Sequence, residues 1–144
     1  MDKSDRAAVY FSEGFSCAQA VFAAFSEDEG LATPTALRLS EALGGGIAGQ
    51  GMTCGAVTGA LLAIGLKHGR IEGQDAAAKD TTRELSQQFM ERFAAQHGSI
   101  QCQALLSLDI SMPDELAEVR ERGLFKSLCP VFVRDAAALL EEML

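Results

Sequence analysis

The chain has 144 residues, of which 48% are hydrophobic, and it carries a formal net charge of -8 at pH 7. That length and hydrophobic content are typical of one globular domain with its own core, so we expect a single domain over residues 1–144. The negative charge argues against nucleic acids and anionic membranes as partners, because both repel an acidic protein. The first residues lack the basic and apolar regions of a secretory signal, which predicts a cytoplasmic protein with reduced thiols.

The first predicted elements lie within residues 5–25, where apolar side chains recur at spacings of three and four. This spacing is typical of one face of an amphipathic helix. Gly14 interrupts the pattern, and Ser16 and Gln19 fit a capping box that would start a second helix with Cys17 in its first turn. One continuous helix with Cys17 as a small core residue fits the same letters, and both alternatives stay open at this point.

A short helix and a glycine-rich segment follow. Thr33 and Pro34 are typical of a helix start, and the predicted helix ends at the glycines of positions 44–46. The segment Leu43–Leu66 carries no charged side chain and contains eight glycines. Roughly 20 apolar residues can span a bilayer, but Gln50 and the glycines make the first half of this segment unsuitable for contact with lipid. We therefore predict a glycine-rich loop, a central buried helix and no membrane insertion.

The central helix is predicted to start at Cys54, with Thr53 as its N-cap. Gly55, Gly59 and Ala63 follow at four-residue steps, which places small side chains on one face of the helix. A neighbouring helix can pack closely against such a face. The same face would also suit a homodimer, and this interpretation, a helical interaction protein, is a third functional alternative.

The second half of the chain is also predicted to be helical. A long amphipathic helix is expected over residues 74–97, and Ser99 would cap a short helix with Cys102 in its first turn. Residues 111–122 predict a charged peripheral helix, and Cys129 precedes the proline of a last helix. Neither alternating β-branched residues nor hairpin turns occur. The predicted fold is all-α, a single-domain bundle of about five to seven helices with the glycine-rich loop before its central buried helix.

Four isolated cysteines are the main chemical signal of the sequence. They are Cys17, Cys54, Cys102 and Cys129, and none belongs to a close pair of the kind that zinc fingers use. Each has a predicted place in the first turn of a helix, where free amides and the helix dipole favour thiolate over thiol. A lowered pKa is what nucleophilic, redox-active and metal-ligating cysteines need. The alternative is four inert thiols that packing places in the core.

These cysteines carry a family resemblance that covers nearly the whole chain. Their spacing, with Cys54-Gly-Ala-Val-Thr-Gly59 at the second one, resembles the C_GCAxxG_C_C family of small redox-active proteins. The family label writes its central motif as GCAxxG, whereas this chain has cysteine before glycine. The resemblance implies redox or metal chemistry at Cys17, Cys54, Cys102 and Cys129, and it supplies no known reaction.

Two hypotheses follow for the function of the thiols. In the first, two of the cysteines cycle between dithiol and disulfide, and Cys54 is the predicted attacking thiol because glycines leave room around it and its helix start favours thiolate. In the second, the four thiolates bind an iron–sulfur cluster or a zinc ion, and backbone at Gly51, Thr53, Gly55 and Gly59 contributes to the cofactor site. The sequence identifies neither a redox partner nor a substrate, and whether the protein is an enzyme stays open.

The two histidines have a simpler interpretation. His97 stands five residues before Cys102 and could be a ligand, but a position at a helix C-terminus beside Gly98 accounts for it. His68 beside Gly69 has the same explanation. Neither histidine has a recognisable carboxylate partner, and no Ser/His/Asp arrangement exists, which argues against hydrolase chemistry.

Overall fold

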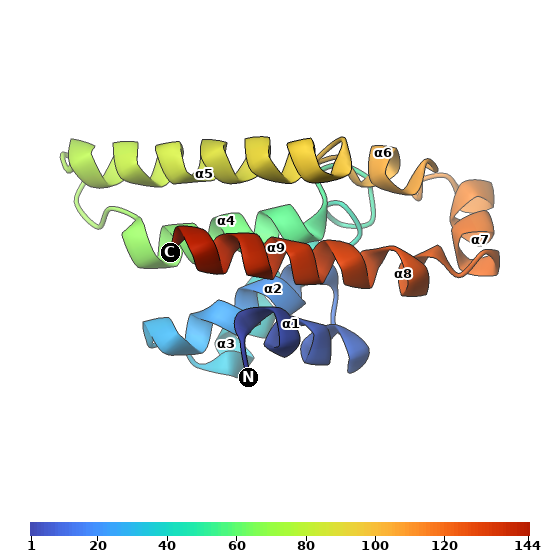
Figure 1. Ribbon diagram of the computed structural model, residues 1–144, viewed down its shortest axis with the longest axis horizontal. Coiled ribbons are helices and arrows are strands. Elements are labelled where there is room, and N and C mark those ends of the chain that lie inside the picture. Colours follow the sequence, from blue (N-terminus) through green and yellow to red (C-terminus); the bar gives the residue numbers. More distant parts are fainter.

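The computed structural model describes residues 1–144 and consists of helices and turns without a strand (Figure 1). The helices are α1 (Lys3–Ser12), α2 (Cys17–Ser26), α3 (Thr33–Ser40), α4 (Gly55–His68), α5 (Ala76–His97), α6 (Cys102–Leu106), α7 (Pro113–Glu121), α8 (Leu124–Ser127) and α9 (Cys129–Met143). Two 3-10 turns, η1 (Glu27–Glu29) and η2 (Glu41–Leu43), follow α2 and α3. The predicted all-α fold is confirmed.

The number of α-helices is nine, whereas about five to seven helices were predicted. Two of the segments are very short, since α6 has 5 residues and α8 has 4 residues. A helix of one turn makes few internal hydrogen bonds and depends on packing for its stability. A helix as short as α8 is too short to show a hydrophobic period of its own, so the sequence pattern does not distinguish it from the neighbouring helices.

Helices α2 and α4 form the centre of the molecule, and α1, α3, α5 and α9 pack around them (Figure 1). All residues of α2 from Ala18 to Ser26 are buried. Helix α4 approaches α2 closely at Gly59, where a Cβ would lie only 2.5 Å from the carbonyl oxygen of Ala18. Glycine is required there because any side chain would separate the two central helices.

The small-residue face of α4 is used inside the molecule. A Cβ at Gly55 would lie 2.8 Å from the backbone nitrogen of Ala18, and Ala63 is only 1% exposed. The contact with α2 therefore covers the face that the sequence offered for a homodimer. In the folded chain this face is occupied by α2, and the possible homodimer stays a prediction.

The helical part of the uncharged segment that suggested a membrane span contributes most of its residues to the core, whereas Met52 before it is exposed. This helical part, α4, has 14 residues, whereas a transmembrane helix needs about 20. No helix of the chain combines the length and the apolar character that crossing a membrane requires.

The buried apolar side chains form two clusters. The larger one lies between α2, α4, α5 and α9 and includes Cys54. The smaller one lies around α6, α7, α8 and the start of α9, and it includes Cys102 and Cys129. Cys17 packs against both clusters. The four cysteines therefore lie where the two clusters meet.

Candidate functional site

The first cysteine, Cys17, is the first residue of α2. The Ser16 hydroxyl oxygen accepts a hydrogen bond from the Gln19 amide at 3.3 Å, and the Ser16 amide donates to the Gln19 side chain at 3.0 Å. This is the capping box that the sequence indicated. Of the two alternatives for this region, the one with a separate second helix is confirmed.

The last cysteine, Cys129, is the first residue of α9, and Pro130 follows it in the first turn. Proline is tolerated there because its missing N–H would have no partner inside the helix. Cys17 and Cys129 therefore both stand at the N-terminal ends of long, well-packed helices, as predicted.

Cys54 and Cys102 are positioned by a small piece of antiparallel backbone pairing. Thr53 and Gln101 form an isolated bridge, and on one side of it the Cys54 amide donates to the Ile100 carbonyl at 2.7 Å. On the other side the Cys102 amide donates to a carbonyl of the glycine-rich loop at 2.6 Å. Successive side chains of extended backbone point to opposite faces. The side chains of Cys54 and Cys102 therefore share one face of the bridge, and those of Thr53 and Gln101 point to the opposite face.

Two predicted caps are wrong for this reason. Helix α4 begins at Gly55 and not at Cys54, and Thr53 belongs to the bridge instead of capping the helix. The Ser99 hydroxyl accepts a hydrogen bond from the Gln101 amide at 3.0 Å, so it closes a turn before α6 and does not cap that helix. Pairing between segments that are distant in sequence replaced local capping in both places.

The glycine-rich segment lets backbone approach two of the cysteines. Gly46 has a φ of +68°, and a Cβ on it would lie 2.8 Å from the Cβ of Cys102. A Cβ on Gly55 would lie 3.1 Å from the Cβ of Cys17. Larger residues at either position would displace the neighbouring cysteine. The glycines thus explain how backbone from distant parts of the chain closes around the thiols.

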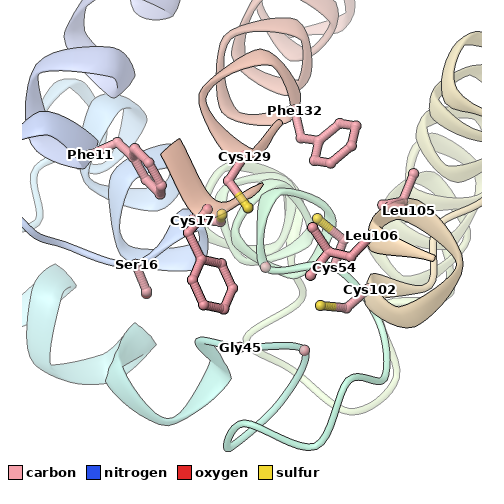
Figure 2. Close-up of a pocket in the computed structure, with 13 residues that line it drawn as sticks. Phe11, Ser16, Cys17, Gly45, Cys54, Cys102, Leu105, Leu106, Cys129 and Phe132 are labelled. Carbon is pink, nitrogen blue, oxygen red and sulfur yellow. The ribbon is translucent and has the colours of Figure 1, made fainter. Parts of the chain in front are cut away.

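All four cysteines line one cavity of about 270 Å³ (Figure 2). None of them is in a disulfide. Cys54, Cys102 and Cys129 are 5%, 9% and 8% exposed, and Cys17 is partly buried. The other residues of the wall are Phe11, Ser16, Gly45, Gly46, Gly55, Leu105, Leu106, Phe125 and Phe132. The predicted set of four cysteines is therefore brought together at one place.

The residues predicted to contribute backbone to a cofactor site are mostly elsewhere. Gly55 lines the cavity, whereas Gly51, Thr53 and Gly59 do not. Gly51 packs beside Asp109, where a Cβ would lie 3.1 Å from a carboxylate oxygen. Thr53 belongs to the bridge, and Gly59 belongs to the contact between α2 and α4.

Cys17 and Cys129 are close enough for one thiol to donate to the other, and their sulfur atoms lie beside each other in Figure 2. Donation from Cys17 lowers the pKa of Cys129, although burial opposes this effect. The same donation, followed by burial and by repulsion from the other cysteines, raises the pKa of Cys17 well above its ordinary value. Cys129 is therefore the thiol that ionises first, and Cys17 is the donor that stabilises its thiolate.

Cys54 and Cys102 have the opposite character. Burial raises the pKa of Cys54 to about 11, although the amides of Ala56 and Val57 act in the other direction without forming a regular capping bond. Burial and repulsion from Cys54 and Cys129 raise the pKa of Cys102 to about 12. The prediction that its helix start makes Cys54 an acidic thiol is wrong, because the cost of burying a charge is larger than the effect of the helix amides.

The four cysteines are also candidate ligands of a metal centre. Four thiolates are a suitable set for zinc or an iron–sulfur cluster. No group of three or more His, Cys, Asp and Glu side chains in the chain is arranged so that it could hold one metal ion. In this conformation the cysteines fit a thiol pair with two further thiols nearby better than they fit a closed ligand cage.

His97 has a carboxylate partner that sequence reasoning missed. Its Nε2 atom lies 3.1 Å from a carboxylate oxygen of Asp135 on α9, without the alignment of a hydrogen bond. The imidazole also packs against Phe93 and Phe132, with ring centroids 4.7 Å and 5.1 Å away. His97 does not line the cysteine cavity, so its role is to connect α5 with α9.

The apolar wall of the cavity was also missed. It consists of Phe11, Leu105, Leu106, Phe125 and Phe132, which come from α1, α6, α8 and α9. In the sequence these residues are ordinary members of the apolar stripes of their helices. Only their short distance in sequence from Cys102 or Cys129 could have indicated that they line the cavity. Phe11 is far from both cysteines in sequence and lacks even this signal.

The fold and the site together define a helical protein with four free thiols around one cavity. The chain belongs to the family described as "Putative redox-active protein (C_GCAxxG_C_C)", whose model matches residues 15–143. The resemblance noted in the sequence is thereby confirmed. No curated protein and no solved structure matches the chain significantly.

Proposed function

We propose that this protein is a dithiol–disulfide redox protein in which Cys129 is the attacking thiol and Cys17 is the resolving thiol. The observation that carries the proposal is that these two thiols lie beside each other at the cavity (Figure 2). Their interaction lowers the pKa of one and raises that of the other. A thiolate with a neighbouring protonated thiol is the arrangement that thiol–disulfide exchange requires. The reaction also needs reduced thiols, which is their expected state in the cytoplasm.

The reaction has two exchange steps. The Cys129 thiolate attacks one sulfur of an external disulfide, which forms a mixed disulfide and releases the other half as a thiolate that takes up a proton from solvent. Cys17 then loses its proton to solvent and attacks the Cys129 sulfur, which expels the second half as a thiolate that takes up a proton from solvent. In sum, two protein thiols become one disulfide, and one external disulfide becomes two thiols.

The raised pKa of Cys17 suits the order of these steps. Its main causes are the interaction with Cys129 and burial, with repulsion from the other cysteines added. Once Cys129 is part of a mixed disulfide it carries no charge, so the interaction that kept Cys17 protonated is lost. The resolving thiol therefore becomes more acidic only after the first step.

Peptide mapping tests this assignment. Reduced protein is treated with one equivalent of a small disulfide, the remaining thiols are blocked, and the linked peptides are identified by mass spectrometry. We expect a link between Cys17 and Cys129, and in Cys17→Ser we expect a stable mixed disulfide at Cys129. A link between Cys54 and Cys102 in the wild-type protein, or no link at all, would contradict the proposal.

The alternative, a cluster- or zinc-binding module with the four cysteines as ligands, is decided by a separate measurement. Protein purified anaerobically is analysed for iron, zinc and inorganic sulfide, and its visible spectrum is recorded. Stoichiometric metal that is lost in Cys54→Ser and Cys102→Ser as well as in Cys17→Ser and Cys129→Ser would replace the dithiol proposal. Metal-free protein with four titratable thiols would support it.

A further inference from the structure

We propose that the oxidant accepted by this site is a small, uncharged organic disulfide, and that the cavity rejects charged ones. This inference rests on the proposed dithiol function and adds to it the chemical class of the substrate. It follows from the composition of the wall, from the charges around it and from the size of the cavity.

The wall of the cavity offers no ion-pair partner to a charged group. Apart from the four thiols, it consists of three phenylalanines, two leucines, three glycines and Ser16. The Ser16 amide donates to the Gln19 side chain and the Ser16 hydroxyl oxygen accepts from the Gln19 amide, which leaves only the Ser16 hydroxyl proton without a partner. No Lys, Arg, His, Asp or Glu side chain lines the cavity. A carboxylate or ammonium that entered would lose its hydration and gain no ion pair in return.

The charges near the cavity add to the rejection of anions. Asp109 is close enough to repel the Cys102 thiolate and contributes to its raised pKa. The chain as a whole carries a formal net charge of -8. The attacking group is itself an anion, so a negatively charged disulfide meets repulsion both on approach and at the reacting sulfur.

A group of three cations that could attract an anion lies elsewhere. Arg70, Lys79 and Arg83 line a different pocket, which contains none of the cysteines. That pocket is formed by the N-terminal half of α5 and the segment after α4, whereas α6 and Cys102 follow the C-terminal end of α5 (Figure 1). An anion drawn to these side chains would therefore be held away from the thiols.

The cavity is also small. Its volume of about 270 Å³ is at the lower limit of pockets that enclose drug-sized ligands, roughly 300–1,000 Å³. It accommodates a disulfide with short arms, and the thioalkyl arm that stays on Cys129 in the mixed disulfide would contact phenylalanine and leucine side chains. Apolar or uncharged arms gain from this contact, and charged arms do not.

Three disulfides with arms of similar length test the inference: hydroxyethyl disulfide, which is uncharged, cystamine, which is cationic, and dithiodiglycolate, which is anionic. The rate of Cys129 oxidation is measured with each reagent and divided by the rate at which the same reagent oxidises dithiothreitol, an uncharged thiol, which removes differences in intrinsic reactivity. We expect the uncharged reagent to exceed the anionic one by at least about tenfold after this correction. Normalised rates that are equal, or higher for either charged reagent, would overturn the inference.

A lysine in the wall should reverse the preference. Phe125 is partly exposed and belongs to the short helix α8, so the stem of a lysine can follow the apolar surface while its ammonium reaches the cavity. We expect Phe125→Lys to reduce the ratio of uncharged to anionic rates several-fold. Gln74→Lys adds the same charge at the exposed, opposite end of α5 and should leave the ratio unchanged. An equal change of the ratio in both variants would show that only net charge matters, which contradicts the inference.

If Phe125→Lys does not fold by circular dichroism, Leu105→Lys provides the same test from α6. Failure of the inference can be told apart from failure of the proposed function. If Cys17 and Cys129 become linked at normalised rates that do not depend on reagent charge, only the substrate class is wrong. If none of the three reagents links them, the dithiol function itself is wrong.

Discussion

The two sides of the cysteine cavity differ although they are built from the same residue type. On one side Cys17 and Cys129 begin α2 and α9 and interact through their thiols, and the pKa of Cys129 is lowered. On the other side Cys54 and Cys102 flank a backbone bridge, and burial raises their pKa values to about 11 and about 12. All four stand at helix starts, so the helix terminus does not decide which thiol ionises. A donor within hydrogen-bond distance decides it.

The largest expected effect on stability comes from a substitution in the glycine-rich loop that packs against Cys102. In Gly46→Ala the new methyl would lie 2.8 Å from the Cβ of Cys102 on backbone with a φ of +68°. Overpacking and left-handed strain together should lower the free energy of unfolding by roughly 2–4 kcal/mol, measured by urea denaturation.

Gly49→Ala is the matched control for this variant. Gly49 has a φ of +72° but nothing within 4 Å of its Cβ position, so only the strain of roughly 1–2 kcal/mol should remain. Equal losses in the two variants would show that the close approach to Cys102 contributes nothing to stability.

The pH dependence of stability should reveal the buried thiol of Cys54. Its pKa in the folded protein, about 11, is higher than that of an unfolded thiol, so the folded state binds this proton more tightly. Its contribution to stability is complete below about pH 9 and is lost as the pH rises through 11. Between about pH 8 and about pH 10.5 the loss from this group should be on the order of 2 kcal/mol. Urea denaturation at both pH values should give a smaller loss for Cys54→Ala, and an unchanged loss would contradict the assignment.

Alkylation rates should separate the two sides directly. Cys54, Cys102 and Cys129 are similarly exposed, so the fraction of thiolate controls their reaction with iodoacetamide. At about pH 8 a thiol with a pKa of about 11 is roughly 100-fold less ionised than one with a pKa below 9. The greater nucleophilicity of the more basic thiolate offsets part of this difference. Peptide-resolved labelling should show Cys129 reacting on the order of tenfold faster than the other two, and equal rates would remove the basis of the comparison.

The smallest expected effect is a shift in the pKa of Cys129 when the Cys17 thiol is replaced. Cys17→Ala removes the donor, so the pKa of Cys129 should rise and its alkylation profile should move to higher pH. Cys17→Ser keeps an O–H donor at the same position and should retain most of the lowered pKa. Identical profiles for both variants and the wild-type protein would show that another group stabilises the Cys129 thiolate.

Local signals in the sequence indicated helix starts at Cys17 and Cys129, although a continuous helix through Cys17 also stayed open. The capping box of Ser16 and Gln19 and the proline after Cys129 act within one turn, so the letters nearby are sufficient. Thr53 and Ser99 were assigned wrongly as caps because Thr53 and Gln101 pair across a distance in sequence that no local rule describes. The partner of His97 was missed for the same reason, since Asp135 lies on a different helix.

The sequence by itself determined that the chain is all-α, that its glycines let backbone approach closely, and that four cysteines stand at or next to helix starts. These features follow from the hydrophobic period and from local backbone chemistry, which act over a few residues. Only the tertiary structure decided that Cys17 meets Cys129, that Cys54 is buried with a raised pKa, and that the wall between them is uncharged. The pKa of a thiol depends on its distance to charges and donors and on its burial, and both are properties of the packed helices.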